Sequence, residues 1–264
     1  MINSFVFVEN LDKDLQDFVF FSLRSLWTQS SNAIEGNTFT LGETAFFLKE
    51  GLTIAGKTLQ EHLDIRGYSD AIEKIFDMVS PSRILKKEDL FFLHKIVQRE
   101  SIVDIYKPVG KWKNENNGTY ILDDEGKSAW HEYPSYIDTP RFMDQWLEQF
   151  SQLHPTSKDE AIVAYAESHL SFVSIHPFYD GNGRMARLLS NFPVLQSGFP
   201  PIIISNKSRQ DYITICSNFQ KNGKIFPEKN DCDQFVDFLK KQWASTWDII
   251  YKAYEQQRKR NFYN

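Results

Sequence analysis

The sequence predicts a mostly α-helical fold that carries one small β-hairpin. Apolar residues recur at helical spacing in long segments, including residues 18–34 and 160–173. Residues 110–134 lack that spacing and instead contain glycines and an asparagine pair around the strand-like run 119–122. With 264 residues, the chain can form one large domain or two small ones, each with its own core.

Composition excludes several classes of protein. Hydrophobic residues make up 41% of the chain and aromatic residues 15%, as in a globular protein. The formal net charge is −5, whereas nucleic-acid-binding domains normally show a basic surface, so no nucleic-acid partner is expected. Cys216 and Cys232 are too few for the disulfide framework of a secreted protein. Because the sequence shows neither a signal peptide nor an apolar run of membrane length, we expect a cytoplasmic location and no membrane partner.

Residues 1–85 are predicted to form an N-terminal helical region. Its first long helix should end near Gly36, because glycine adopts the left-handed conformation with which many helices end. Thr40 and Glu43 have the spacing of a capping box, so a second helix is expected to begin there. Pro81 indicates a junction to the next part of the chain.

Residues 51–58 match the phosphate-binding P-loop pattern GxxxxGK[ST] letter for letter. That pattern is credible only between a buried strand and a helix. Here it follows a predicted helix that ends at Gly51, and Ile54 and Ala55 are too short a run for a core strand. We therefore interpret the segment as a turn between helices, in which Lys57 binds no nucleotide.

From residue 86 onward the pattern is again helical outside the predicted hairpin. Apolar residues share one face across residues 86–98, and an amphipathic helix is expected across residues 234–254. The basic residues 258–260 are predicted to form a solvated tail rather than a binding patch. The expected organisation is an N-terminal helical region, a central domain, and a C-terminal helix with its tail, at residues 1–85, 86–240 and 241–264.

Residues 176–187, which read HPFYDGNGRMAR, carry the strongest functional signal. Gly181 and Gly183 flank Asn182 and permit backbone conformations that a Cβ would forbid. A glycine-bounded loop that enters a helix leaves N–H groups free, and the helix dipole there favours an anion. These three residues are therefore predicted to cradle a phosphate.

Charged side chains around this loop complete the predicted phosphate site. Arg184 and Arg187 lie three positions apart on one helix face, and each guanidinium can take two phosphate oxygens. Asp180 would repel a phosphate unless a cation lies between them, which predicts a shared divalent ion, Mg²⁺. His176 can accept a proton near neutral pH and is the candidate general base for an incoming hydroxyl.

The order HPFxDGNGRxxR resembles the core motif of the Fic (Fido) family, and every motif position matches. The resemblance covers roughly residues 86–240 and implies a Fic-like helical bundle. It also implies AMP transfer, in which the histidine deprotonates a protein hydroxyl that attacks the α-phosphate of ATP, and pyrophosphate leaves. Carried over to this chain, His176 is the base, Asp180 holds Mg²⁺, Arg184 contacts the α/β-phosphates and Arg187 contacts the γ-phosphate.

A second match lies in the N-terminal region. Ser31, Glu35 and Gly36 fit the family's inhibitory pattern, [S/T]xxxE[G/N]. Glu35 would lie at the negative end of a helix dipole, which disfavours a carboxylate by about 0.3–1 kcal/mol, so we expect it to have a partner. The resemblance supplies Arg187, which this pairing would withdraw from the γ-phosphate. Because the pattern lies N-terminal to the Fic-like residues of the same chain, it resembles the class with an N-terminal inhibitory helix. An exposed helix-end glutamate is the plain alternative.

Three further expectations depend on the resemblance. Residues 110–134 resemble the family's flap, a hairpin that docks an extended segment of the target protein by strand pairing, with a turn at residues 124–126; a plain surface hairpin is the alternative. Lys113 stands where many relatives have an arginine.

Relatives often place a tyrosine near Tyr212 against the adenine, although a half-buried helix tyrosine explains it equally well. Pro193 falls in a run that the family keeps helical, so a kink or an early end is expected there.

Together these patterns predict a protein adenylyltransferase that moves AMP from Mg·ATP to a serine, threonine or tyrosine hydroxyl of a target protein and is autoinhibited by Glu35. The alternatives among enzymes are transfer of another nucleotide or phosphate group, and removal of AMP with Glu35 aligning a water. The alternative from another class is a non-catalytic nucleotide-sensing interaction module, which would not need His176. The expected partners are ATP and a target protein, with self-modification and a homodimer left open.

Overall fold

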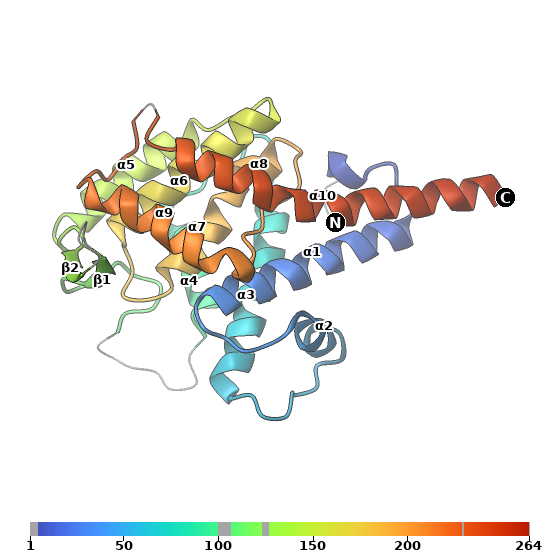
Figure 1. Cartoon of the computed structure of the whole chain (residues 1–264), viewed down its shortest axis with the longest axis horizontal. Helices are drawn as coiled ribbons and strands as arrows, with labels where there is room; N and C mark the ends of the chain where they lie inside the picture. Colours follow the sequence, from blue (N-terminus) through green and yellow to red (C-terminus); the bar gives the residue numbers. More distant parts are fainter. Residues whose placement is uncertain (1–4, 100–106, 123–126, 229, 264) are drawn as a thin grey trace.

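The computed structural model describes residues 5–99, 107–122, 127–228 and 230–263. They form a mostly helical bundle with a two-stranded antiparallel sheet at one end (Figure 1). The predicted mostly α-helical fold with a small hairpin is confirmed.

The hairpin divides the helices of the chain into an earlier and a later set. Within the described residues, the elements are η1 (Val6–Val8), α1 (Lys13–Ile34), α2 (Leu41–Glu50), α3 (Leu59–Met78), α4 (Lys87–Val97), β1 (Gly118–Leu122), β2 (Ser128–Glu132), α5 (Thr139–Ser151), α6 (Lys158–Ile175), α7 (Asn182–Leu189), α8 (Asn191–Gln196), η2 (Asn206–Ser208), α9 (Arg209–Lys221) and α10 (Asp233–Tyr263). The predicted turn at residues 124–126 lies outside the described residues.

The helix ends in the N-terminal region lie where the capping signals place them. α1 has Glu35 at its C-cap, and Gly36 follows in the left-handed conformation with φ of 99°. Thr40 and Glu43 form the predicted capping box of α2, with the Glu43 N–H donating to Thr40 Oγ1 at 3.2 Å and the Thr40 N–H donating to Glu43 Oε2 at 2.8 Å. Local sequence therefore determines where α1 ends and places Glu35 at its C-cap.

The segment that matches the P-loop pattern is a connection between α2 and α3, as predicted. α2 ends at Gly51 in the left-handed conformation, and α3 begins with a capping box at Thr58. Residues 51–58 contain no strand. Lys57 Nζ donates to the Thr38 carbonyl at 2.7 Å, so this lysine binds the neighbouring loop.

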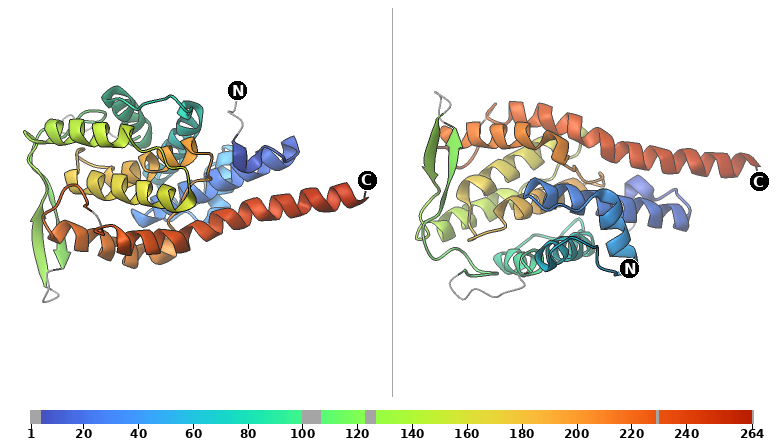
Figure 2. Two further views of the ribbon diagram at one scale, coloured as in Figure 1. Left: turned by 90° about the horizontal axis from the view of Figure 1, so that it is seen from above. Right: turned by 60° about the horizontal axis from the view of Figure 1, so that its bottom comes forward.

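Two long helices organise the bundle. α6 packs against α5, α7, α8, α9 and α10, and it is buried on nearly every side, which explains its apolar composition all round. α1 packs against α2 and α3 and also against α7 and α10 (Figure 2). Because Leu23 and Trp27 of α1 are fully buried, the N-terminal region is held against the rest of the bundle.

The structure confirms the expected early helix end before Pro193. α7 ends at Leu189, and a separate helix, α8, begins at Asn191. Pro193 lies in the first turn of α8, where a backbone N–H needs no partner within the helix.

Residues 258–260 are predicted to form a solvated tail; Arg258 and Lys259 are indeed exposed, but the segment is helical and not a tail. α10 begins at Asp233 and continues to Tyr263. The Arg260 guanidinium donates to both carboxylate oxygens of Asp14, at 2.9 and 2.7 Å, so the N-terminal turn of α1 supports the last turns of α10. The expected boundary between residues 240 and 241 falls inside this continuous helix, and the division into three parts stays a prediction.

The length and apolar character of the helices decide whether any of them could span a membrane. Across the described ranges, no helix is both long enough and apolar enough to cross a bilayer.

Candidate active site

The end of α6 presents His176. Its backbone adopts the left-handed conformation, with φ of 50°, and its N–H donates to the Phe172 carbonyl at 3.0 Å. The ring lies 3.8 Å from the Tyr133 ring, centroid to centroid, and nearly parallel to it. His176 Nδ1 lies 3.3 Å from the Val173 carbonyl, which favours the proton on Nδ1 and leaves Nε2 as the nitrogen that can accept a proton.

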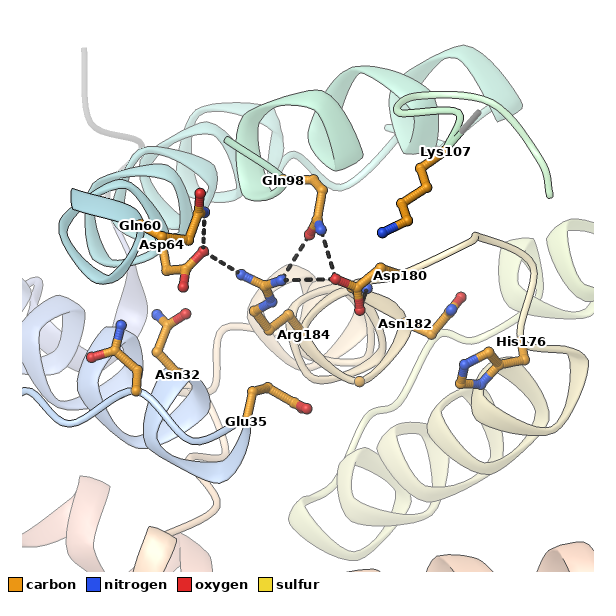
Figure 3. A pocket seen from close by; sticks show the side chains of 13 residues that line it. Asn32, Glu35, Gln60, Asp64, Gln98, Lys107, His176, Asp180, Asn182 and Arg184 are labelled. Carbon is orange, nitrogen blue, oxygen red and sulfur yellow. Dashed lines mark hydrogen bonds and ion pairs between the residues drawn. The ribbon is translucent and has the colours of Figure 1, made fainter. Parts of the chain in front are cut away.

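A cavity of about 700 Å³ lies beside His176, between the motif loop and the N-terminal helices (Figure 3). It brings together Glu35, the predicted base His176, the predicted metal ligand Asp180 and the predicted phosphate-binding residues 181–184. Arg187 and Tyr212 are not among the described residues that line it. The lining residues are Asn32, Glu35, Asn37, Gln60, Asp64, Gln98, Lys107, His176, Asp180, Gly181, Asn182, Gly183 and Arg184.

The floor of the cavity is the N-terminus of α7. Gly181 is the N-cap residue, in the left-handed conformation with φ of 75°. The Asn182 side chain closes the loop by accepting from the Phe178 N–H and donating to the Phe178 carbonyl, both at 2.9 Å. The first N–H groups of α7 have no partner within the helix, so this end can receive an anion.

Gly183 allows Glu35 to approach the same helix end. A Cβ at Gly183 would lie only 2.6 Å from Glu35 Oε1, which is closer than such contacts occur. The carboxylate of Glu35 therefore lies against the backbone that the sequence predicts to cradle a phosphate.

Arg184 is nearly buried and joins several groups along one wall of the cavity. Its NH1 donates to Asp64 Oδ1 at 3.1 Å, and its NH2 donates to Gln98 Oε1 at 2.7 Å. Gln98 in turn donates to Asp180 Oδ2 at 2.8 Å (Figure 3). The Asp180 side chain is 68% exposed, and desolvation by the surrounding cavity wall acts to raise its pKa. Arg184, the Gly181 N–H and Gln98 together hold the pKa below its usual range, so Asp180 is ionised at neutral pH.

Sequence reasoning missed Asp64 and Gln98. They lie 120 and 86 positions from Arg184, and neither belongs to a local pattern. The one available signal was indirect: the buried Arg184 guanidinium requires acceptors that the motif itself does not supply.

The predicted pairing of Glu35 with Arg187 is confirmed. Arg187 NH2 donates to Glu35 Oε1 at 2.6 Å, and the Arg187 side chain is only 3% exposed. Ser31 of the same N-terminal pattern accepts twice from Arg187, from Nε to its hydroxyl at 2.9 Å and from NH2 to its carbonyl at 3.0 Å. The Tyr212 hydroxyl accepts from Arg187 NH1 at 3.1 Å and lies 3.1 Å from His169 Nε2, and Tyr212 is buried.

A second histidine supports the motif loop from α4. His94 stacks on Phe178 with ring centroids 3.8 Å apart. The Gly110 N–H donates to His94 Nδ1 at 2.8 Å, so the ring proton is on Nε2, which donates to the Asp180 carbonyl at 3.0 Å. Burial lowers the pKa of His94 to about 4, so the ring is neutral and acts as a fixed bridge. From the sequence, His94 is expected only to lie on one face of a helix, and its contact with the motif loop is not predicted.

The donor set beside Asp180 limits how a metal could bind. Among the described residues, no group of three or more His, Cys, Asp or Glu side chains could hold a metal ion. Of the three described carboxylates that line the cavity, Glu35 pairs with Arg187 and Asp64 with Arg184, and Asp180 is the one on the motif loop. One carboxylate with phosphate oxygens and water is a usual arrangement for Mg²⁺, so the residues fit that ion only when a phosphate ligand is bound.

Comparison with known protein families identifies the class to which this fold and site belong. Residues 84–193 match the model of the Fic/DOC family. Through this domain, the chain belongs to the Fic/DOC family.

Curated relatives and a solved structure agree with that assignment. The chain is 32% identical to "Protein adenylyltransferase Fic" of Nematostella vectensis and 34% identical to the Drosophila erecta protein of that name, over 75% and 83% of this chain. It spans less than half of these two relatives, 43% and 40% of their lengths. A crystal structure of a Fic domain containing signaling protein from Bacteroides thetaiotaomicron superposes with a TM-score of 0.82 at 25% identity, over 94% of this chain and 93% of the other. The expected Fic-like helical bundle is confirmed.

Proposed function

We propose that this chain is a protein adenylyltransferase that transfers AMP from ATP to a hydroxyl of a target protein. The observation that carries the proposal is the cavity in which His176, Asp180 and Arg184 surround the N-terminus of α7. That arrangement offers a base, a metal-binding carboxylate and an anion site within one volume. The relatives are longer than this chain, and their name, protein adenylyltransferase, supports the same reaction.

In the proposed reaction, the target hydroxyl gives its proton to His176 Nε2 as its oxygen attacks the α-phosphorus of ATP. The bond from the α-phosphorus to the bridging oxygen breaks, and pyrophosphate leaves with that electron pair. The α7 N–H groups and Arg184 stabilise the charge that develops on the phosphate oxygens. Mg²⁺ held by Asp180 would neutralise phosphate charge when bound.

His176 is suited to this task because it is neutral. Burial, followed by the positive charge of Lys113, lowers the pKa of His176 to about 3. The imidazole is therefore unprotonated throughout the physiological range and holds a lone pair at Nε2 for the incoming hydroxyl proton.

The transferred group is tested with ATP labelled at its α-phosphate or at its γ-phosphate. The Glu35→Gly variant, in which the proposed autoinhibition is relieved, is incubated with each and with a lysate, and protein-bound label is measured. Label from the α-position alone is expected, since AMP contains that phosphate. Protein-bound label from the γ-position alone would show phosphoryl transfer and contradict the proposal. Absence of bound label in the presence of measured ATP binding would favour the non-catalytic module.

Autoinhibition by Glu35 is the second part of the proposal. Glu35 pairs with Arg187, so Arg187 is not free to bind a γ-phosphate, and the carboxylate itself lies against Gly183. A triphosphate would meet a negative charge at that end of the cavity instead of a positive one. Release of Glu35 would reverse both effects at once.

Arg187→Ala is expected to remove the gain in transfer that Glu35→Gly produces, because the freed guanidinium is the group that would hold the γ-phosphate. Transfer is measured for wild type, for both single variants and for the double variant. An undiminished gain in the double variant would show that the two residues do not communicate.

Lys57→Ala is expected to leave ATP affinity unchanged, because Lys57 binds the Thr38 carbonyl and does not line the cavity. Arg184→Ala should weaken ATP binding by about tenfold or more, since it removes a charged donor to the phosphates. Both affinities are measured by calorimetry. An equal loss in Lys57→Ala would restore the P-loop interpretation of residues 51–58.

A second candidate function is removal of AMP from a modified protein. The observation that favours it is that Glu35 and His176 line the same cavity, so a carboxylate could align a water beside the histidine. Incubation of an AMP-modified protein with wild type and with Glu35→Gln distinguishes the two directions of reaction.

The hairpin is the proposed docking place for the target. Within the described residues, its two strands pair with each other and with no third strand, so each offers an edge for an extended segment. A contact of Tyr212 with the adenine, self-modification, a homodimer and a cytoplasmic location stay predictions.

A further inference from the structure

Lys113 is a buried lysine beneath the motif loop. It is only 3% exposed, which is rare for a lysine without partners. Its backbone N–H donates to the Pro177 carbonyl at 2.8 Å. Its ammonium donates to Asn117 Oδ1 at 2.7 Å and to the Ile175 carbonyl at 3.5 Å. Lys113 therefore contacts the residues directly before and after His176.

The same segment joins the base of the hairpin to the loop. The Asn117 amide donates to the Phe178 carbonyl at 3.2 Å, and the Asn117 carbonyl accepts from the Tyr133 N–H at 3.1 Å. Tyr133 is the residue whose ring stacks on His176. The Lys113 ammonium lies 5.9 Å from the centroid of the Tyr133 ring. One ammonium thus supports two segments that hold the imidazole.

The charge of Lys113 acts on the imidazole as well as its contacts. Burial makes the largest contribution to the lowered pKa of His176, and the Lys113 ammonium makes the next. Around the ring, the Val173 carbonyl of α6 and Asp180 of the loop favour the imidazolium, while His131 of β2 disfavours it. The ammonium opposes a second positive charge, so its removal should make His176 easier to protonate.

We infer that Lys113 is a positioning residue for His176: its ammonium fastens the hairpin base to the motif loop and so holds the Tyr133 ring against the imidazole. The inference depends on the proposed function in one respect, that His176 is the base of the transfer. The contacts through which Lys113 supports the imidazole do not depend on that function.

Titration of His176 by NMR tests this inference without measuring activity. The ring signal is assigned by its loss in His176→Ala and followed from pH of about 8 to about 2, a range that includes the lowered pKa of His176. In Lys113→Met the protonation midpoint of His176 is expected to rise by about 1 pH unit or more, because one nearby positive charge is removed. Lys113→Arg keeps the charge and should titrate like wild type. Lys111→Met removes an exposed lysine two positions away and should also titrate like wild type.

Circular dichroism confirms that each variant is folded, and Lys113→Gln replaces Lys113→Met if the latter does not fold. Superimposable His176 titration curves in wild type and the folded neutral variant would overturn the inference. Steady-state kinetics provide a second measurement. In Lys113→Met, kcat should fall about tenfold because the base is less well positioned. The KM for ATP should change little, since Lys113 does not line the cavity. A loss confined to KM would equally contradict the positioning role.

Discussion

Glu35→Gly is expected to raise transfer of AMP by about 10- to 100-fold, the range of a typical coupling between two sites. The reason is the 2.6 Å ion pair with Arg187, which holds a nearly buried guanidinium away from the cavity. Loss of the carboxylate frees that cation and removes a negative charge from the N-terminus of α7. The initial rate of AMP incorporation into protein measures the effect.

Glu50→Gly is the matched control for this variant. Glu50 is also a helix-end glutamate, at the last residue of α2, but it does not line the cavity. Its replacement should leave the rate unchanged. A fall in AMP incorporation in Glu35→Gly would contradict autoinhibition, and a fall in the release of AMP from a modified protein would favour a role for Glu35 in aligning a water.

His176→Ala is expected to lower transfer by about 10²- to 10⁴-fold, the usual contribution of a general base. ATP affinity should be retained, because the phosphate-binding groups belong to α7 and Arg184 rather than to the imidazole. The two quantities are separated by measuring kcat in the Glu35→Gly background and ATP affinity by calorimetry.

His154→Ala controls for the loss of a histidine, since His154 is exposed and is not one of the lining residues. Transfer that persists in His176→Ala at the rate of the control would remove His176 from the role of base. A parallel loss of ATP affinity would show instead that the variant disturbs the phosphate site.

Most of the fold and the motif could be predicted because their signals are local. Helical spacing, the capping box of Thr40 and Glu43, and the left-handed glycine at Gly36 each act within a few residues. The motif is likewise one continuous segment, so its loop geometry follows from Gly181 and Asn182. The pairing of Glu35 with Arg187 is not local, and it became predictable only through the resemblance to the family.

The remaining features depend on tertiary contacts that no local pattern encodes. Asp64 and Gln98 reach Arg184 from separate elements, and Tyr133 covers His176 from the segment after β2. The last turns of α10 are a second case. A basic run such as residues 258–260 resembles a tail until Asp14 of α1 supplies a partner for Arg260.

The central claim is that this site attaches AMP to protein and that Glu35 restrains it. Intact-mass spectrometry of lysate proteins after incubation with Glu35→Gly and ATP tests both parts directly, with wild type and the Glu35→Gly/His176→Ala double variant alongside. The expected result is a protein heavier by one AMP with Glu35→Gly, far less of it with wild type, and none with the double variant. Addition of a phosphate alone, or equal amounts of AMP-modified protein with wild type and Glu35→Gly, would contradict the claim.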